Sequence, residues 1–216
     1  MHPLLETVKQ DGVVAVTRGN FPPAVALPLA ETLLAEGIHS LELTFNSVQP
    51  LESLRALKRE HGDRLAVGMG TVLREDDARA ALDAGADFIV SPAFQPNIVR
   101  LVQDAGCPMI PGVMTPSEAV QAWEMGLELL KLFPIGALGI DYFKAFFAPL
   151  DHMQFMCNGA MNERNTVEFL KAGAIAVGMG NWLTGDGTWS AEQIRQRARV
   201  LKEAIRTARD PQTRFA

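Results

Sequence analysis

The feature that most constrains this chain is a regular alternation of short apolar runs with longer amphipathic runs, repeated eight times. The short runs have the length and composition of buried strands, and the long runs have the apolar spacing of helices. The predicted strands are 13–17, 40–44, 65–70, 88–91, 109–112, 127–133, 154–157 and 175–178. The predicted helices are 24–36, 50–60, 75–84, 96–105, 116–125, 139–148, 163–172 and 191–209. Such a series predicts a parallel sheet with helices packed outside it.

The residues at the helix ends support these boundaries. Five predicted helices end in a glycine that suits a left-handed C-cap: Gly37, Gly85, Gly106, Gly126 and Gly173. Prolines open three helices, at Pro50, Pro96 and Pro116, and Asn162 is a good N-cap for the seventh. The same pattern therefore continues along the chain, without a linker between units.

Eight β-α units in one uninterrupted series predict a single α/β domain over residues 1–216, a (β/α)₈ TIM barrel. The alternative is a doubly wound open sheet. That fold often carries a glycine-rich dinucleotide fingerprint after its first strand, and no such motif follows residues 13–17. The barrel is therefore the favoured interpretation.

Composition excludes several kinds of partner. The net charge is −5 and no basic tract is present, so we expect no binding to nucleic acid. No apolar stretch approaches the roughly 20 residues of a membrane span, and the first residues carry charges too early for a signal peptide. We therefore expect a cytoplasmic protein. The two cysteines and four histidines have no ligand-like spacing, which predicts no metal site.

A lysine lies inside the apolar run "ELLKLFP". Side chains alternate between the faces of a strand, so Lys131 shares a face with Leu129 and Phe133. Glu42 lies late in the second predicted strand, and catalytic groups of such barrels sit at the carboxyl ends of strands. We therefore expect Lys131 and Glu42 to point into the barrel and share one cavity.

A charged side chain is costly in an apolar interior unless it is paired, neutral or chemically used. A neutral lysine amine is a nucleophile that forms Schiff bases with carbonyl compounds, and a nearby carboxylate can transfer protons. The pair therefore suits making or breaking a bond next to a ketone. The alternative is that Lys131 and Glu42 form a buried ion pair with a purely structural role.

Six motifs, in this order, resemble one known family. They are "LELTFNS", "GMGTVL" at 68–73, "SPAF" at 91–94, "IPGVMTPSEA" at 110–119, "LKLFP" at 130–134 and "VGMGNWL" at 177–183. The chain resembles the class I aldolases of 2-keto-3-deoxy-6-phosphogluconate, 2-keto-3-deoxy-6-phosphogalactonate and 4-hydroxy-2-oxoglutarate. The resemblance runs from Val13 to Trp182 and is closest to the phosphogalactonate branch.

The resemblance implies a role for several residues. Lys131 is similar to the Schiff-base lysine, Glu42 to the general acid/base, and Thr71 to the hydroxyl donor that binds the pyruvyl carboxylate. Pro92 and Phe133 resemble pocket walls. The implied reaction cleaves a 2-keto-3-deoxy sugar acid to pyruvate and an aldehyde such as glyceraldehyde 3-phosphate. The family is usually homotrimeric and uses no metal or organic cofactor.

One departure concerns the substrate carboxylate. Phosphogluconate-type members carry an arginine after the second strand, where this chain has Asn46. Arg18, after the first strand, is expected to supply the missing cation, and the two residues together are expected to bind substrate. The alternative for Arg18 is a solvated loop residue.

The other departures concern phosphate. The resemblance implies a phosphate site in the last two loops, and the corresponding residues are Asn158, Gly159, Ala160, Gly180 and Asn181. Ala160 replaces a family glycine, and Asn181 stands where a serine is frequent. A non-phosphorylated or shorter 2-keto acid is therefore an alternative substrate. An isomerase or epimerase barrel and a non-catalytic binding barrel are the alternative functions.

Overall fold

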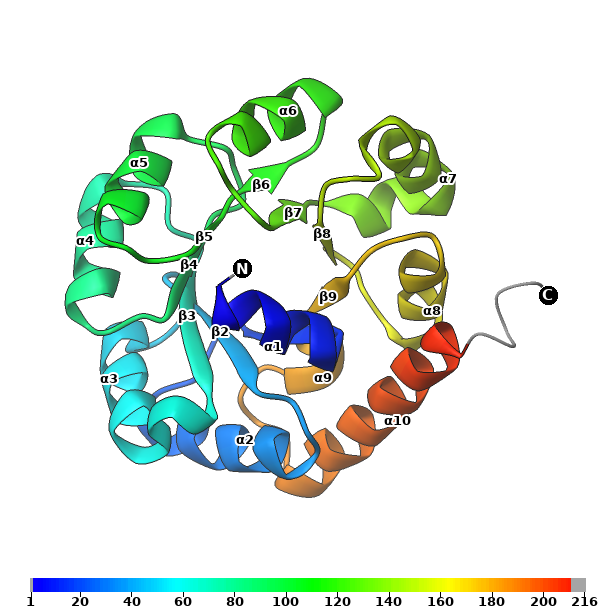
Figure 1. The fold of residues 1–216 in the computed structure, drawn as a ribbon. Helices are drawn as coiled ribbons and strands as arrows, with labels where there is room; N and C mark the ends of the chain where they lie inside the picture. The colour runs from blue at the N-terminus through cyan, green and yellow to red at the C-terminus, as the bar shows by residue number, and fades with distance from the viewer. Residues whose placement is uncertain (1, 211–216) are drawn as a thin grey trace.

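The computed structural model describes residues 2–210; Met1 and residues 211–216, which the predicted domain includes, lie outside the described residues. Over this range the parallel strands form one sheet in the order β5-β4-β3-β2-β1-β9-β8-β7-β6. The two end strands, β5 (Met109–Ile110) and β6 (Gly112–Val113), are separated only by Pro111. The sheet therefore closes on itself, and the predicted (β/α)₈ barrel is confirmed (Figure 1).

The other strands lie close to their predicted positions. They are β1 (Val13–Thr17), β2 (Ser40–Thr44), β3 (Ala66–Gly70), β4 (Phe88–Val90), β7 (Leu130–Leu132), β8 (Phe155–Asn158) and β9 (Ala176–Met179). The fifth predicted strand is divided because proline has no N–H to donate to a ladder. The Pro111 carbonyl still accepts a hydrogen bond from the Lys131 N–H at 2.9 Å, so the sheet remains joined there.

The covering helices alternate with these strands. They are α2 (Pro23–Ala35), α3 (Pro50–His61), α4 (Glu75–Asp83), α5 (Pro96–Asp104), α6 (Pro116–Glu124), α7 (Ile135–Phe147), α8 (Glu163–Lys171) and α10 (Ala191–Arg209). All five predicted C-cap glycines have a left-handed φ, between 70° and 119°. The three prolines open α3, α5 and α6, and Asn162 caps α8 through its side chain.

Three helical features differ from the predictions. Helix α7 begins four residues before its predicted start and is distorted at Gly139, where φ is 81°. A short helix α9 (Asn181–Thr184) follows the last strand, and α1 (Pro3–Asp11) precedes the first. Both were missed because they fall outside the β-α repeat. The two helices lie at opposite ends of the barrel, α9 at the mouth and α1 at the base.

The base of the barrel is closed by α1, which lies across the centre of the ring in Figure 1. Leu4, Leu5 and Val8 pack against the lower interior of the barrel, which includes Val14 and Met156. A second and larger core fills the space between the strands and the outer helices. Because the base is closed, the carboxyl ends of the strands form the open end.

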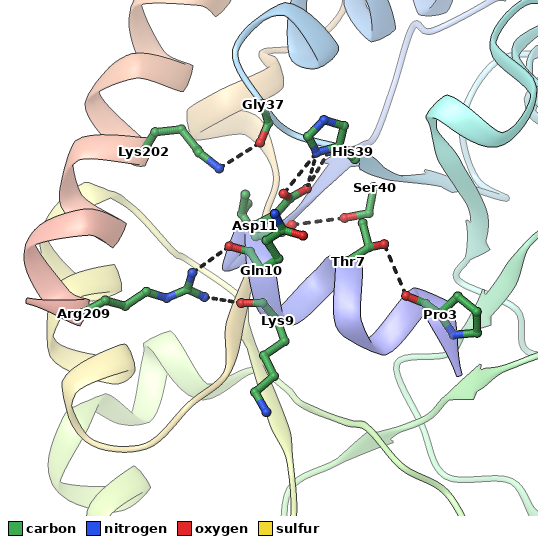
Figure 2. Close-up of polar contacts among 11 residues, drawn as sticks. Pro3, Thr7, Lys9, Gln10, Asp11, Gly37, His39, Ser40, Lys202 and Arg209 are labelled. Atoms are coloured by element: carbon green, nitrogen blue, oxygen red, sulfur yellow. Dashed lines mark hydrogen bonds and ion pairs between the residues drawn. The ribbon is translucent and has the colours of Figure 1, made fainter. Parts of the chain in front are cut away.

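Polar contacts hold α1 in this position (Figure 2). The buried Asp11 carboxylate accepts a hydrogen bond from the His39 backbone N–H at 2.6 Å. Arg209, at the end of α10, donates to the carbonyl oxygens of Gln10 and Lys9 at 2.7 and 2.5 Å. These bonds satisfy carbonyl groups at the carboxyl end of α1 that have no partner within the helix. They connect the first and last helices of the described chain.

Candidate active site

Lys131 projects into the barrel, as its position in the strand predicts. Its neighbours Leu130 and Leu132 belong to the core beneath the helices, whereas Leu129 belongs to the core inside the barrel. The lysine is only 5% exposed. Strand alternation therefore identified the direction of this side chain correctly.

Glu42 lies opposite Lys131. Strands β2 and β7 are four places apart in the sheet order, which is across the ring of eight. Oε1 of Glu42 is 3.6 Å from Nζ of Lys131, within ion-pair distance, and Glu42 is fully buried. Neither carboxylate oxygen has a hydrogen-bond partner among residues 2–210. An uncompensated buried carboxylate is strongly unfavourable, so the lysine is the group that stabilises it.

A missing side chain makes room for the Glu42 carboxylate. A Cβ atom placed on Gly70, in the neighbouring strand β3, would overlap Oε1 of Glu42. The glycine is therefore part of the site although it carries no functional group. Its motif, "GMGTVL", was noticed in the sequence, but that it makes room for Glu42 follows only from the packing of β2 against β3.

A pocket of about 420 Å³ opens above the lysine. Its walls come from the ends of β1, β7, β8 and β9 and from the loops that follow them. Eight of the predicted site residues line it: Arg18, Lys131, Phe133, Asn158, Gly159, Ala160, Gly180 and Asn181. Val16 and Met161 also line it and were not predicted. Its volume is typical of a site for a small organic molecule.

Two residues give the pocket its contrasting surfaces. The Phe133 ring lies 5.4 Å from Nζ of Lys131, measured to the ring centroid, so an apolar wall flanks the amine. Arg18 is exposed and, among residues 2–210, makes no hydrogen bond or ion pair. It is therefore a cation available to an anionic group, on the wall that also carries the loops after β8 and β9.

Three predicted substrate-binding residues do not line this pocket. Asn46 is exposed in the turn after β2, and Pro92 follows β4, with its carbonyl group packed against Gly112. Thr71 follows β3 and has a φ of 61°, which is rare for a β-branched residue. All three lie at the carboxyl ends of strands, on the same end of the barrel as the pocket.

The loops predicted to bind phosphate have an unusual backbone. Gly159 has a φ of 96° and Ala160 a φ of 52°, so an alanine occupies the left-handed region where glycine is unstrained. A Cβ on Gly136 would overlap the Gly159 carbonyl oxygen, which shows how closely the start of α7 approaches this loop. Gly180 and Asn181 begin the short helix α9.

Asn158 differs from the other four residues predicted to bind phosphate, because it lies inside the barrel. It ends β8, is 4% exposed, and its Oδ1 atom has no hydrogen-bond partner in the described part of the chain. A Cβ on Gly178, its partner in β9, would overlap the amide. Glu42 and Asn158 thus occupy similar spaces, each created by a glycine in a neighbouring strand.

Residues 2–210 contain no group of three or more histidine, cysteine or acidic side chains that could hold a metal ion. Burial raises the pKa of the Cys107 thiol to about 12 and also raises that of Cys157, so neither is a ready nucleophile. In the same part of the chain, no helix has the length and apolar character needed to cross a membrane.

Known proteins resemble this chain in both sequence and fold. The family model described as KDPG and KHG aldolase matches residues 5–200. A 2-dehydro-3-deoxy-phosphogluconate aldolase of Haemophilus influenzae is 33% identical, over 83% of this chain and 84% of its own length. A 2-dehydro-3-deoxy-6-phosphogalactonate aldolase of Escherichia coli K12 is 32% identical, over 91% and 95%.

A solved structure described as native KDPGal superimposes with a TM-score of 0.86 and 29% identity, over 91% of this chain and 95% of its own. The family match covers most of the chain and includes both β2 and β7, which carry Glu42 and Lys131. The fold, the sequence matches and the buried lysine agree, and this chain belongs to the KDPG and KHG aldolase family, whose members are lyases.

Proposed function

We propose that this protein is a Schiff-base aldolase that cleaves a 2-keto-3-deoxy sugar acid to pyruvate and an aldehyde. The observation that carries the proposal is the buried pair of Lys131 and Glu42, 3.6 Å apart below a pocket open at the barrel mouth. A lysine used in this way must be able to lose its proton, and Glu42 is close enough to accept it.

In the proposed reaction the neutral amine of Lys131 attacks C2 of the substrate, and loss of water gives an iminium ion. Glu42, through a water molecule, takes the proton of the C4 hydroxyl group. The C3–C4 bond then breaks, the aldehyde leaves, and the electron pair passes into the iminium to give an enamine. Protonation at C3 and hydrolysis release pyruvate and restore the lysine.

We further propose that Thr71, Arg18 and Asn46 bind the anionic and polar groups of the substrate, with Pro92 and Phe133 as walls. The left-handed φ of Thr71 supports its part, because strained backbone is concentrated at functional sites. The available guanidinium of Arg18 supports an anion on its side of the pocket. By family analogy we propose a homotrimer in the cytoplasm.

The names of the relatives favour a phosphorylated substrate, of the phosphogalactonate or phosphogluconate type. The proposed phosphate site consists of Gly159, Ala160, Gly180 and Asn181. One observation favours a second candidate, a non-phosphorylated or shorter 2-keto acid: Ala160 places a side chain in a loop whose backbone N–H groups would hold the phosphate. A cleavage panel of matched phosphorylated and non-phosphorylated acids distinguishes the two.

The test of the Schiff base is reduction with borohydride in the presence of pyruvate, followed by mass spectrometry. We expect one covalent adduct on Lys131 and none in Lys131→Ala. Lys58→Ala is the matched control, because Lys58 is partly buried and paired with Asp87 at 2.6 Å, away from the pocket. This variant should keep the adduct. Absence of any adduct in the unmodified protein rejects the proposed function.

A further inference from the structure

The motif "TFNS" at the end of β2 brings two hydroxyl side chains, Thr44 and Ser47, against the loop that carries Arg18. Thr44 is fully buried and Ser47 is partly buried. The Ser47 backbone N–H donates to the Thr44 carbonyl at 2.9 Å, which closes a tight turn and folds the serine back over the threonine. Neither residue lines the pocket that contains Arg18 and Lys131. A role in the site must therefore pass through a neighbour.

The direction of the hydrogen bonds around this turn follows from the number of hydrogens. Thr44 Oγ1 carries one hydrogen, and its 2.8 Å bond to the Thr17 carbonyl uses it, because a carbonyl only accepts. Ser47 must then be the donor in the 2.9 Å bond between the two hydroxyl groups. The Ser47 oxygen in turn accepts the Gly19 backbone N–H at 3.1 Å. One directed chain thus runs from Gly19 through two hydroxyl groups to Thr17.

The two ends of this chain are the residues on either side of Arg18. Gly19 is held a second time, because its carbonyl accepts the Val48 N–H at 2.9 Å. The φ of Gly19 is 118°, a conformation that glycine adopts readily and that residues with side chains rarely adopt. The Arg18 guanidinium, by contrast, makes no hydrogen bond or ion pair with residues 2–210. The backbone around Arg18 is thus fixed, while its charge is left available.

A fixed backbone matters for a long cationic side chain. An arginine that binds an anion must order its own rotamers, and ordering a mobile backbone at the same time would weaken binding further. A loop that is already held in the free protein avoids this second loss. The two hydroxyl groups supply that order although they contact nothing in the pocket.

We propose that Thr44 and Ser47 are positioning residues that hold the backbone on both sides of Arg18, and so present its guanidinium to an anionic group of the substrate. The proposal rests on the proposed aldolase function and on the proposed anion-binding role of Arg18. The anionic group is the carboxylate of the keto acid or a terminal phosphate, which share the chemistry that a guanidinium recognises.

The test is a double-mutant cycle between Ser47→Ala and Arg18→Ala, with KM and kcat measured for the addition of pyruvate to glyceraldehyde 3-phosphate. Ser47→Ala removes the acceptor of the Gly19 N–H and the donor to Thr44. We expect it to raise the KM of the reactant that Arg18 binds by about tenfold, the scale of ordering one residue's backbone, with kcat nearly unchanged. Thr44→Val, which keeps the branched shape without the hydroxyl group, should have the same effect.

The decisive quantity is the effect of Ser47→Ala when Arg18 is absent. In the Arg18→Ala background the serine substitution should change KM by less than about twofold, because the charge that it positions is gone. The same data identify the anion. A coupled rise in the KM of pyruvate assigns Arg18 to the carboxylate. A coupled rise in the KM of glyceraldehyde 3-phosphate, but not of glyceraldehyde, assigns it to the phosphate. Either result supports the proposal.

Two further variants separate positioning from general stability. Ser47→Thr retains the hydroxyl group and should retain the KM of the unmodified protein. Ser53→Ala is the matched control, because it removes a buried serine hydroxyl of α3 that donates to the Phe21 carbonyl at 2.8 Å, on the same connection after β1 but beyond Gly19. This variant should lose stability and keep the KM values unchanged.

An unchanged KM in Ser47→Ala and Thr44→Val would overturn the proposal. So would an equal rise in KM with and without Arg18, or an equal rise in Ser53→Ala. Borohydride reduction with pyruvate is performed on each protein to separate the two levels of the argument. An adduct on Lys131 without the coupling between Ser47 and Arg18 refutes the positioning role alone. Absence of an adduct in the unmodified protein refutes the aldolase function and this proposal with it.

Discussion

At the scale of single residues, the site depends as much on absent side chains as on present ones. Lys131 and Glu42 can meet only because position 70 is glycine, and Asn158 lies inside the barrel only because position 178 is glycine. The lysine and the glutamate could be predicted from their residue types and strand alternation. The two glycines could not, because an overlap between neighbouring strands depends on their register, which is not a local property.

Substitution of Gly70 is a direct test of this arrangement. In Gly70→Ala the new Cβ would overlap Oε1 of Glu42, and the carboxylate must move away from Lys131. We expect kcat for aldol cleavage to fall by about 100-fold, the scale of one general acid/base contribution. Steady-state kinetics with a cleavable 2-keto-3-deoxy acid checks this.

Gly126→Ala provides the comparison. Gly126 follows helix α6, no described atom lies within 4 Å of a Cβ placed there, and its φ is 81°. The alanine should therefore cost about 1 kcal/mol of stability through backbone strain alone, with kcat unchanged. Retention of full kcat in Gly70→Ala would contradict the assigned importance of this glycine.

At the scale of elements, capping residues and prolines explain where most helices begin and end, since they act within one helical turn. Helix α6 is an example: Thr115 and Glu118 form a capping box, and the Glu118 carboxylate accepts hydrogen bonds from the backbone N–H groups of Met114 and Thr115. These bonds lower the pKa of Glu118 from its ordinary value of 4.5, chiefly through Met114. The division of the fifth strand at Pro111 and the presence of α1 depend on packing, and were not predicted.

The lowered pKa gives the cap a defined pH dependence. A carboxylate whose pKa is depressed on folding stabilises the protein above its unfolded value and loses that effect as the pH falls through the folded value. Glu118→Ala should therefore cost about 1 kcal/mol at pH 7 and clearly less near pH 3. Urea unfolding at the two pH values measures the difference. An equal cost at both would show that the ionised carboxylate is not the stabilising group.

At the scale of the whole molecule, the two ends of the described chain cooperate to close the barrel base. Arg209 of α10 donates to two carbonyl oxygens at the end of α1 (Figure 2). This contact joins residues about 200 positions apart, so no local sequence pattern predicts it. Helix α1 in turn packs against the barrel interior through Leu4, Leu5 and Val8. With the base covered by α1, the pocket that Lys131 lines opens at the mouth.

Removal of the Arg209 side chain should release this end of α1. In Arg209→Ala we expect a loss of about 1–2 kcal/mol and faster amide hydrogen exchange in α1, because carbonyl groups lose their donors. Arg206→Ala is matched to it: Arg206 lies on the same helix, is exposed and pairs with Glu203. That pair should contribute about 0.5 kcal/mol or less. Equal exchange rates in the two variants would argue against the role of Arg209.

The sequence by itself determined the eight β-α units, their order, the barrel they form and the alternation that directs Lys131 inward, because these follow from periodicities and caps that act over a few residues. Only the tertiary structure decided which side chains meet. Closure of the ring sets β2 opposite β7, and strand register sets each glycine beside a polar group. These distances depend on how the whole sheet curves back on itself, and no local spacing encodes them.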